Sequence, residues 1–469
     1  MKRAITRRKF LRDAAALAAS GAVSCRLRAE GAEASGGGGS KSPQASQARA
    51  ASAANPAASK SSGPRTFGRA KSVIQIWFWG GPAHTDTWDP KPSLGYDYCG
   101  PLTSYCKTNV DGLIIGQLMP NLAKCADKYA VVRSATHGLN AHETASYLVQ
   151  TGREPGRFVF PCAGAVVSKF KGYDAGYKGD IPPYIVMTAP QGRFSESGFL
   201  GLRYKPFATG GDPAKTPFQV EGIVARDLSL ARQKSRRQLL DDMDTFKKTL
   251  RNSGYLQSSE RALEQAYNLV LGEAGKVFDV SSEPREVREA YGNNRFGNEC
   301  LIARKLVEVG VPYVTINYGG WDTHKDHFKE MNKLLPPTDR AVAALIADLS
   351  ARGLLDSTIV WWVGEFGRTP KIDWKPPYSG GRHHWGGAFS HMLAGGGFKG
   401  ASVVGATDER GEQVVERPAY PCDIIGSIYY NLGIDTSAGL ITPQGDRVSV
   451  LAGPDEGAKR AGILSEIMS

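Results

Sequence analysis

The sequence lacks any uninterrupted apolar run of about 18 residues, the length that a membrane-spanning helix requires. It also has no Cys-x-x-Cys pair, so the six cysteines after Cys25 do not indicate a structural zinc knot. Neither a Gly-x-Ser-x-Gly nucleophile elbow nor a phosphate-binding loop motif occurs. These absences exclude a helical membrane protein, a zinc-knot module and the commonest serine-hydrolase and nucleotide-binding signatures.

Concentrated positive charge is missing from most of the chain. The net charge is +12, but residues 1–66 hold 12 Lys and Arg against 3 Asp and Glu, which leaves only +3 for residues 67–469. Nucleic-acid binding needs a dense cationic face. The composition therefore argues against a nucleic-acid partner and leaves protein partners undefined.

The N-terminal 28 residues have the pattern of a twin-arginine export signal. Arg7 and Arg8 lie in the segment TRRKFLR, which precedes a weakly apolar stretch that is too short to span a membrane. Residues 29–66 are rich in Ala, Ser and Gly and predict a disordered linker. We therefore expect an exported protein, periplasmic or secreted, whose folded part is residues 67–469, and Cys25 is a candidate site for a lipid anchor.

Short apolar runs in the main body predict buried strands, because they show no polar alternation. These runs are residues 73–79, 184–188, 313–318, 358–363 and 391–394. Amphipathic patterns at 300–309 and 338–352 predict helices, the second with Thr338 as its N-cap. Alternation of strands and helices favours an α/β fold, a three-layer α/β/α sandwich with a mainly parallel sheet, and the charged region 222–293 favours a helical insertion.

Acidic and imidazole side chains gather beside these strands. Parallel α/β sheets bind ligands beyond the carboxyl ends of their strands, so we expect these side chains to meet at one edge. Mixed carboxylate and imidazole ligands suit a divalent metal such as zinc or manganese, and carboxylates alone would suit calcium. The candidate metal ligands are Asp86, Asp89, Asp322, His324, Glu365 and His384.

Further candidates lie in two segments. Arg368 could bind an anionic ester, although Glu365 could instead pair with it. The segment 134–155 offers Thr136, His142 and Thr144 as catalytic candidates, and a helix starting near residue 140 would direct its amides toward an anion. The attacking group is left open between a threonine hydroxyl and a water activated by metal.

The segments GGPAHTDTWDPKP, YGNNRFGNECLIARKLVEVGVPYVTI, GGWDTH, GEFGRTP and GRHHW resemble the bacterial DUF1501 family over residues 71–435. That family is regarded as related to alkaline phosphatases and sulfatases. The resemblance implies an alkaline phosphatase-like fold with a two-metal centre for phosphate or sulfate esters. On this resemblance Asp86 or Asp89 matches the first metal aspartate, whereas Asp322, His324, Glu365 and His384 match later ligands.

The sequence departs from this pattern at two places. The segment TGREP resembles the one that follows the sulfatase nucleophile, but no Cys/Ser-x-Pro-x-Arg motif precedes it, which disfavours a formylglycine sulfatase. His383 stands where family members usually have aspartate. Two functions therefore stay open: an exported metal-dependent hydrolase of phosphate or sulfate esters, and a non-catalytic binding or scaffold protein that keeps the fold.

Overall fold

The computed structural model describes residues 67–189, 196–215, 218 and 273–468. The predicted signal peptide, the predicted linker and residues 222–272 of the predicted insertion lie outside these described residues. The rest of that region contains helix α9 (Arg285–Ala290) and two short 3-10 turns. None of the described helices combines the length and the apolar character that crossing a bilayer demands.

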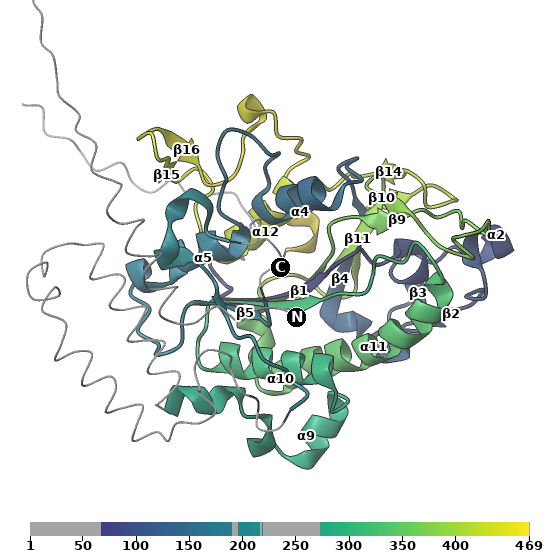
Figure 1. The fold of residues 1–469 in the computed structure, drawn as a ribbon, viewed down its shortest axis with the longest axis horizontal. Helices are drawn as coiled ribbons and strands as arrows, with labels where there is room; N and C mark the ends of the chain where they lie inside the picture. Colours follow the sequence, from purple (N-terminus) through teal and green to yellow (C-terminus); the bar gives the residue numbers. More distant parts are fainter. Residues whose placement is uncertain (1–66, 190–195, 216–217, 219–272, 469) are drawn as a thin grey trace, which may run out of the picture. The chain divides into compact units, whose positions relative to one another are not determined.

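An eight-stranded sheet forms the centre of the described part (Figure 1). Its order is β12 (Ser402–Val404), β4 (Tyr129–Ala135), β11 (Phe389–Ala394), β8 (Thr358–Val363), β1 (Ser72–Phe78), β7 (Tyr313–Tyr318), β5 (Tyr184–Met187) and β6 (Phe207–Ala208). Strand β11 is antiparallel to both of its neighbours, and the other pairings are parallel. The predicted α/β class with a mainly parallel sheet is confirmed.

Helices cover both faces of the sheet, which gives the three layers. On one face lie α10 (Arg295–Glu308) and α11 (His327–Ala351), and on the other lie α5 (Ala163–Lys171) and α12 (Pro421–Asn431) (Figure 1). Helix α4 (His142–Thr151) packs against α12. Parallel strands buried on both faces need this double cover, since an uncovered face would expose apolar side chains.

The central strand β1 contributes side chains to the hydrophobic cores on both faces of the sheet. Ile74, Ile76 and Phe78 face the core shared with α10 and α11, whereas Val73 and Trp77 face the core shared with α5 and α12. Successive side chains of a strand point to opposite faces, so a continuous apolar run fills both sides. This is the physical reason why the run 73–79 could be interpreted as a central strand.

Helix α11 is longer than the sequence pattern predicts, because it starts at His327 and contains Pro336 and Pro337. The prediction that Thr338 caps its start was therefore wrong. Thr338 lies inside the helix, and its hydroxyl donates to the carbonyl oxygen of Leu334. Proline costs helix stability by removing a backbone donor, but the buried stripe that includes Met331 and Leu335 continues on both sides of the prolines and holds the helix against the core.

Candidate metal centre

Three side chains from distant parts of the sequence meet at one point. His142 is the first residue of α4, Asp322 lies in the loop after β7, and His384 lies on β10 (His384–Trp385), which pairs with β9 (Gly367–Arg368). Each offers one ligand atom, and these atoms all lie within 4.8 Å of one another. This spacing suits a single shared metal ion.

Gly80 lets two of the loops that build this centre approach each other. It has a φ of +107°, and an added Cβ would come within 2.1 Å of the backbone nitrogen of Asp322. Any other residue would force the loop after β1 away from the loop after β7. The glycine beside the strand therefore has a direct role in placing Asp322.

His142 is held from its outer side by a buried carboxylate. Its Nδ1–H donates to Oε1 of Glu365 at 2.6 Å, and its Nε2 lies 3.3 Å from Oδ2 of Asp322. Trp79 stacks on the ring, with centroids 5.2 Å apart. The carboxylate fixes the proton on Nδ1, so the lone pair of Nε2 is left to face Asp322.

His384 is held in the same manner, although by a backbone carbonyl. Its Nδ1–H donates to the carbonyl oxygen of Asn140 at 2.7 Å, and its Nε2 lies 3.0 Å from Oδ1 of Asp322. Phe366 stacks on this ring at 4.4 Å. When both rings are neutral, two bare imidazole nitrogens and one carboxylate converge, and either an ion or protons on these nitrogens would relieve their mutual repulsion.

The charges around Asp322 keep its carboxyl group ionised. Burial raises its pKa, but hydrogen bonds from His142 and His384 and the guanidinium of Arg368 outweigh that effect and hold the pKa well below its usual range. Burial likewise lowers the pKa of His142, but hydrogen bonds with Asp322 and Glu365 outweigh it and raise the pKa to about 9. Without metal, a proton on His142 would supply the missing positive charge at neutral pH.

His324 lies beside this cluster, as its sequence position suggested. Its Nε2 is 2.9 Å from Nε2 of His384 and 3.1 Å from Oδ1 of Asp322. Glu365, predicted as a ligand, instead contacts His142 and the backbone N–H of Gly80. Its other carboxylate oxygen is buried and has no hydrogen-bond partner among the residues that the structure describes.

Asp86 and Asp89 do not belong to the cluster, contrary to the sequence expectation. The carboxylate of Asp86 is fully engaged with Arg382 at 3.0 Å and with His327 at 2.7 Å. Asp89 pairs with Arg133 and Lys91, and it accepts from Thr407. Both are buried, so these two carboxylates stabilise the packing of loops rather than face an open site.

Arg368 is also placed differently from the prediction that it binds substrate. Its side chain is fully buried, and its guanidinium donates to backbone carbonyls of Gly80, Gly81 and Arg382 and to Oδ1 of Asp322. An anionic ester would have to displace these bonds. The pairing with Glu365 that the sequence left open is replaced by the pairing with Asp322.

The two candidate threonine nucleophiles have ordinary structural bonds. The hydroxyl of Thr144 donates to the carbonyl oxygen of Ala141 at 3.2 Å, and that of Thr136 donates to Gly386 at 3.4 Å. Within the described part of the chain, neither hydroxyl is bonded to a base that could activate it. His142, proposed from sequence as a catalytic residue of the same segment, is instead the third member of the cluster. The signal in the sequence that pointed to His142 was its position at the start of a predicted helix.

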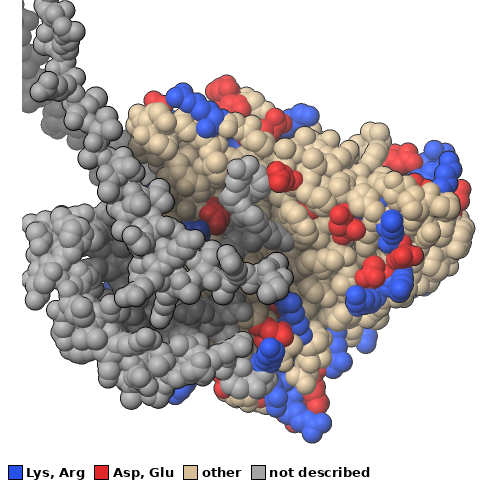
Figure 2. Space-filling view, viewed as in Figure 1, with Lys and Arg blue, Asp and Glu red and all other residues tan. Residues whose placement is uncertain are grey.

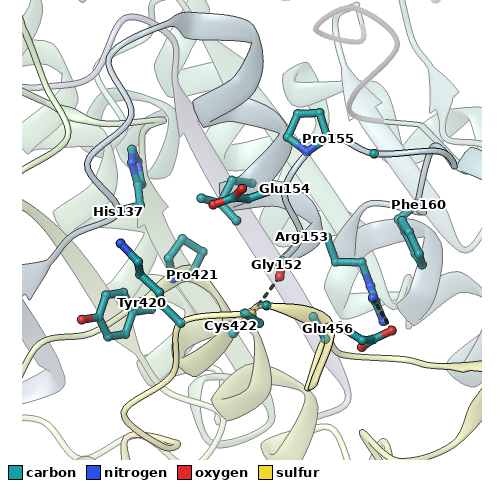
Figure 3. Close-up of a pocket in the computed structure, with 16 residues that line it drawn as sticks. His137, Gly152, Arg153, Glu154, Pro155, Phe160, Tyr420, Pro421, Cys422 and Glu456 are labelled. Carbon is teal, nitrogen blue, oxygen red and sulfur yellow. Dashed lines mark hydrogen bonds and ion pairs between the residues drawn. The ribbon is translucent and has the colours of Figure 1, made fainter. Parts of the chain in front are cut away.

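A separate cavity of about 310 Å³ lies at the other end of α4 (Figure 3). Gly152, Arg153 and Glu154 line it together with Tyr420, Pro421 and Cys422 at the start of α12. The thiol of Cys422 donates to the carbonyl oxygen of Gly152 at 2.8 Å. None of His142, Asp322 and His384 lines this cavity, so it is distinct from the cluster.

Charge is mixed on the described part of the face that Figure 2 shows. On the face drawn in Figure 2, Lys and Arg side chains alternate with Asp and Glu side chains, and they form no continuous patch of one sign. This face agrees with the near-neutral charge of residues 67–469.

Solved structures give loose likenesses. The fold is similar to the lipoteichoic acid synthase LtaP from Listeria monocytogenes, with 10% identity, a TM-score of 0.36 and coverage of 83% of this chain and 77% of that one. A sulfatase from Pseudoalteromonas sp. has 14% identity, a TM-score of 0.36 and coverage of 78% and 68%. A protein in the alkaline phosphatase superfamily from Vibrio parahaemolyticus has 9% identity, a TM-score of 0.35 and coverage of 80% and 69%.

Because these TM-scores are low, the assignment of an α/β fold is based on the strand order and pairing of the central sheet and not on these likenesses. A comparison with curated protein sequences finds no match. A family model described as "Protein of unknown function (DUF1501)" matches residues 70–456, which is most of the chain and includes every member of the cluster. The family resemblance of the sequence segments is thereby confirmed, and the chain belongs to the DUF1501 family.

Proposed function

We propose that the protein is a metal-dependent hydrolase of phosphate or sulfate esters whose ion is held by His142, Asp322 and His384. The observation that carries this proposal is the convergence of their ligand atoms within 4.8 Å. Both histidines direct their Nδ1–H groups to outer acceptors, Glu365 and the Asn140 carbonyl, so their inner nitrogens can bind the ion once they have released any proton.

The donor set suits zinc best among the candidate ions. Two imidazole nitrogens and one carboxylate oxygen match the ligands of catalytic zinc sites, whereas calcium and magnesium prefer oxygen alone. When bound, such an ion supplies Lewis-acid polarisation of an ester oxygen and lowers the pKa of water. Among the described residues, this is the one group of His, Cys, Asp or Glu side chains whose possible ligand atoms all lie within 4.8 Å of one another. We therefore propose a single ion instead of the two that the family resemblance implies.

The side chains around the cluster leave it open on one side and dry on others. The side chain of Asp322 is 42% exposed, so solvent and substrate reach the cluster past this residue. Trp79 and Phe366 cover the ring faces of His142 and His384 and exclude water there. Since the Thr136 and Thr144 hydroxyls donate to backbone carbonyls, we propose water as the nucleophile.

The test combines metal analysis with turnover on a panel of aryl phosphate mono- and diesters and aryl sulfates. We expect about one zinc ion per chain and turnover that Asp322→Ala abolishes together with metal content. Asp326→Asn is the matched control, because this exposed carboxylate lies in the same loop and its side chain makes no capping bond. Metal binding without turnover on any ester would favour the scaffold alternative, and absence of metal from folded protein would refute the site.

Export by the twin-arginine pathway is a second part of the proposal and rests on the segment TRRKFLR. Replacing Arg7 and Arg8 together with lysine keeps the charge but removes the paired guanidinium groups. We expect the wild-type protein outside the cytoplasm and the double variant retained inside, as measured by cell fractionation. Equal export of both proteins would contradict this route.

A further inference from the structure

A second line of polar side chains leads from the cluster toward the loop after β9. Oδ2 of Asp373 lies 3.1 Å from Nε2 of His383, and Nδ1 of His383 lies 3.0 Å from Nδ1 of His324. Nε2 of His324 then reaches His384 and Asp322 at 2.9 and 3.1 Å. Three groups are thus joined end to end, and the last of them touches the proposed site.

The position of each proton in this line follows from the chemistry of its first member. A carboxylate only accepts hydrogen bonds, so Nε2 of His383 carries a proton and donates to Asp373. A neutral imidazole has one N–H, which leaves Nδ1 of His383 as an acceptor, and His324 must donate to it from Nδ1. The remaining nitrogen of His324, Nε2, is therefore bare and points at the cluster.

The backbone fixes the loop that presents this line. Asp373 and Gly381 exchange backbone hydrogen bonds at 2.9 and 3.1 Å, which closes the loop at its base. An added Cβ at Gly381 would come within 1.9 Å of the carbonyl oxygen of His324, so the loop lies directly on the backbone of that histidine. The ring of Tyr378 meets His383 edge to face, with centroids 4.6 Å apart. The line is therefore supported from several sides.

We infer that Asp373 and His383 are positioning residues that aim Nε2 of His324 at the proposed metal ion as a fourth protein ligand, in a site that would still admit water past the side chain of Asp322, which is 42% exposed. This inference rests on the proposed metal site. His384 obtains the same orientation from a carbonyl and His142 from Glu365, so each imidazole has its own outer acceptor. An aspartate at 383 could accept from His324 but would repel Asp373, whereas imidazole bonds with both.

The experiment measures zinc affinity by competition with a chromophoric chelator. We expect His383→Phe to weaken zinc binding roughly 10–100-fold, as loss of an outer partner does at other sites. His383→Gln has an amide that can both donate and accept, and it should recover most of the affinity. Lys375→Ala, an exposed change in the same loop, should bind as wild type does.

A double-variant cycle separates positioning from general damage. If His383 acts through His324, then His383→Phe should cost nothing further in a His324→Ala background. Additive losses would overturn the inference. The visible spectrum of the cobalt-substituted protein gives an independent readout, because loss of one nitrogen ligand changes the band in His383→Phe and in His324→Ala alike. An unchanged cobalt spectrum in both would equally overturn it.

The failure of this inference can be told from failure of the proposed function. If wild-type protein binds no zinc, the metal site itself is refuted. If wild type binds zinc and His383→Phe binds it equally well, the site stands and only the positioning role is refuted.

Discussion

The Nδ1–H of His142 donates to Oε1 of Glu365 at 2.6 Å, across 223 positions of sequence. The same oxygen accepts the backbone N–H of Gly80 at 2.9 Å, and the Glu365 side chain is fully buried. A buried acceptor of this kind fixes the ring of a metal ligand and raises its basicity. The loop after β8 thereby sets the direction in which the first residue of α4 points.

Replacing Glu365 with glutamine tests this relationship. The amide oxygen can still accept from His142 but carries no charge, so we expect zinc affinity to fall about 10–100-fold with the fold retained. The measurement is zinc competition together with thermal unfolding. Glu299→Gln is the control, since Glu299 is equally buried but lies on α10 and contacts Arg295 instead of the cluster. Equal losses in the two variants would point to a general packing effect.

Zinc binding should depend steeply on pH. Burial lowers the pKa of His142, but its hydrogen bonds with Asp322 and Glu365 outweigh this and raise the pKa to about 9. Below that pH the ion must displace a proton, so apparent affinity should rise roughly tenfold per pH unit until about pH 9. Calorimetry in buffers of different ionisation enthalpy should report about one proton released per zinc at pH 7. Binding with no proton release would contradict the assignment.

The strands were predictable because their signal is local. The runs 313–318 and 358–363 match β7 and β8 residue for residue, since a strand buried on both faces is apolar throughout. The site was only half predictable. Asp322 lies beyond the carboxyl end of β7, as the rule for parallel sheets predicts, whereas His384 precedes β11, whose antiparallel direction the sequence did not reveal. Nothing local distinguishes Asp86, which pairs with Arg382 almost 300 residues later, from a ligand.

The misplaced start of α11 has a similar cause. Pro336 and Pro337 are strong local signals for a helix end, and the long-range burial of the preceding turn outweighs them. Sequence patterns record local preference, whereas the choice between two carboxylates or two helix starts depends on contacts between distant segments.

Asp86→Asn should destabilise the fold and leave metal binding intact. It would leave the buried guanidinium of Arg382 without its counter-charge, which costs about 3–5 kcal/mol. Denaturant unfolding measures the loss, and zinc content is determined on the folded fraction. Asp356→Asn is the matched control, since this carboxylate is 85% exposed in its pair with Arg69 and should cost about 1 kcal/mol or less. Loss of zinc from folded Asp86→Asn would restore Asp86 as a ligand.

Arg368→Lys separates a structural role from substrate binding. Lysine keeps the charge but cannot reach the same set of carbonyls around Gly80, so buried acceptors lose their donors and we expect a loss of about 2–4 kcal/mol. The affinity for inorganic phosphate, followed as a thermal shift, should change little in the folded variant. Weaker phosphate binding with unchanged stability would instead support the original assignment of Arg368 to substrate.

Acid should destabilise the metal-free protein partly through His391. This fully buried imidazole accepts from Nε1 of Trp361 at 3.0 Å, while its own Nε2 has no hydrogen-bond partner in the described structure. Burial, together with the nearby His137, lowers its pKa to about 3. The unfolded chain binds a proton near pH 6.5 and the folded chain does not, so stability falls as the pH drops below that value, by about 2 kcal/mol at pH 5.

The variant His391→Gln keeps an acceptor for Trp361 but has no proton to bind. We expect its stability to change less between about pH 7 and pH 5 than that of wild type, by up to the same 2 kcal/mol. Urea unfolding of both proteins in the presence of a chelator measures the difference. The variant should retain the share due to His137, whose pKa burial lowers to about 4. Parallel pH profiles would mean that His391 is protonated in the folded chain, at odds with its place in an apolar strand.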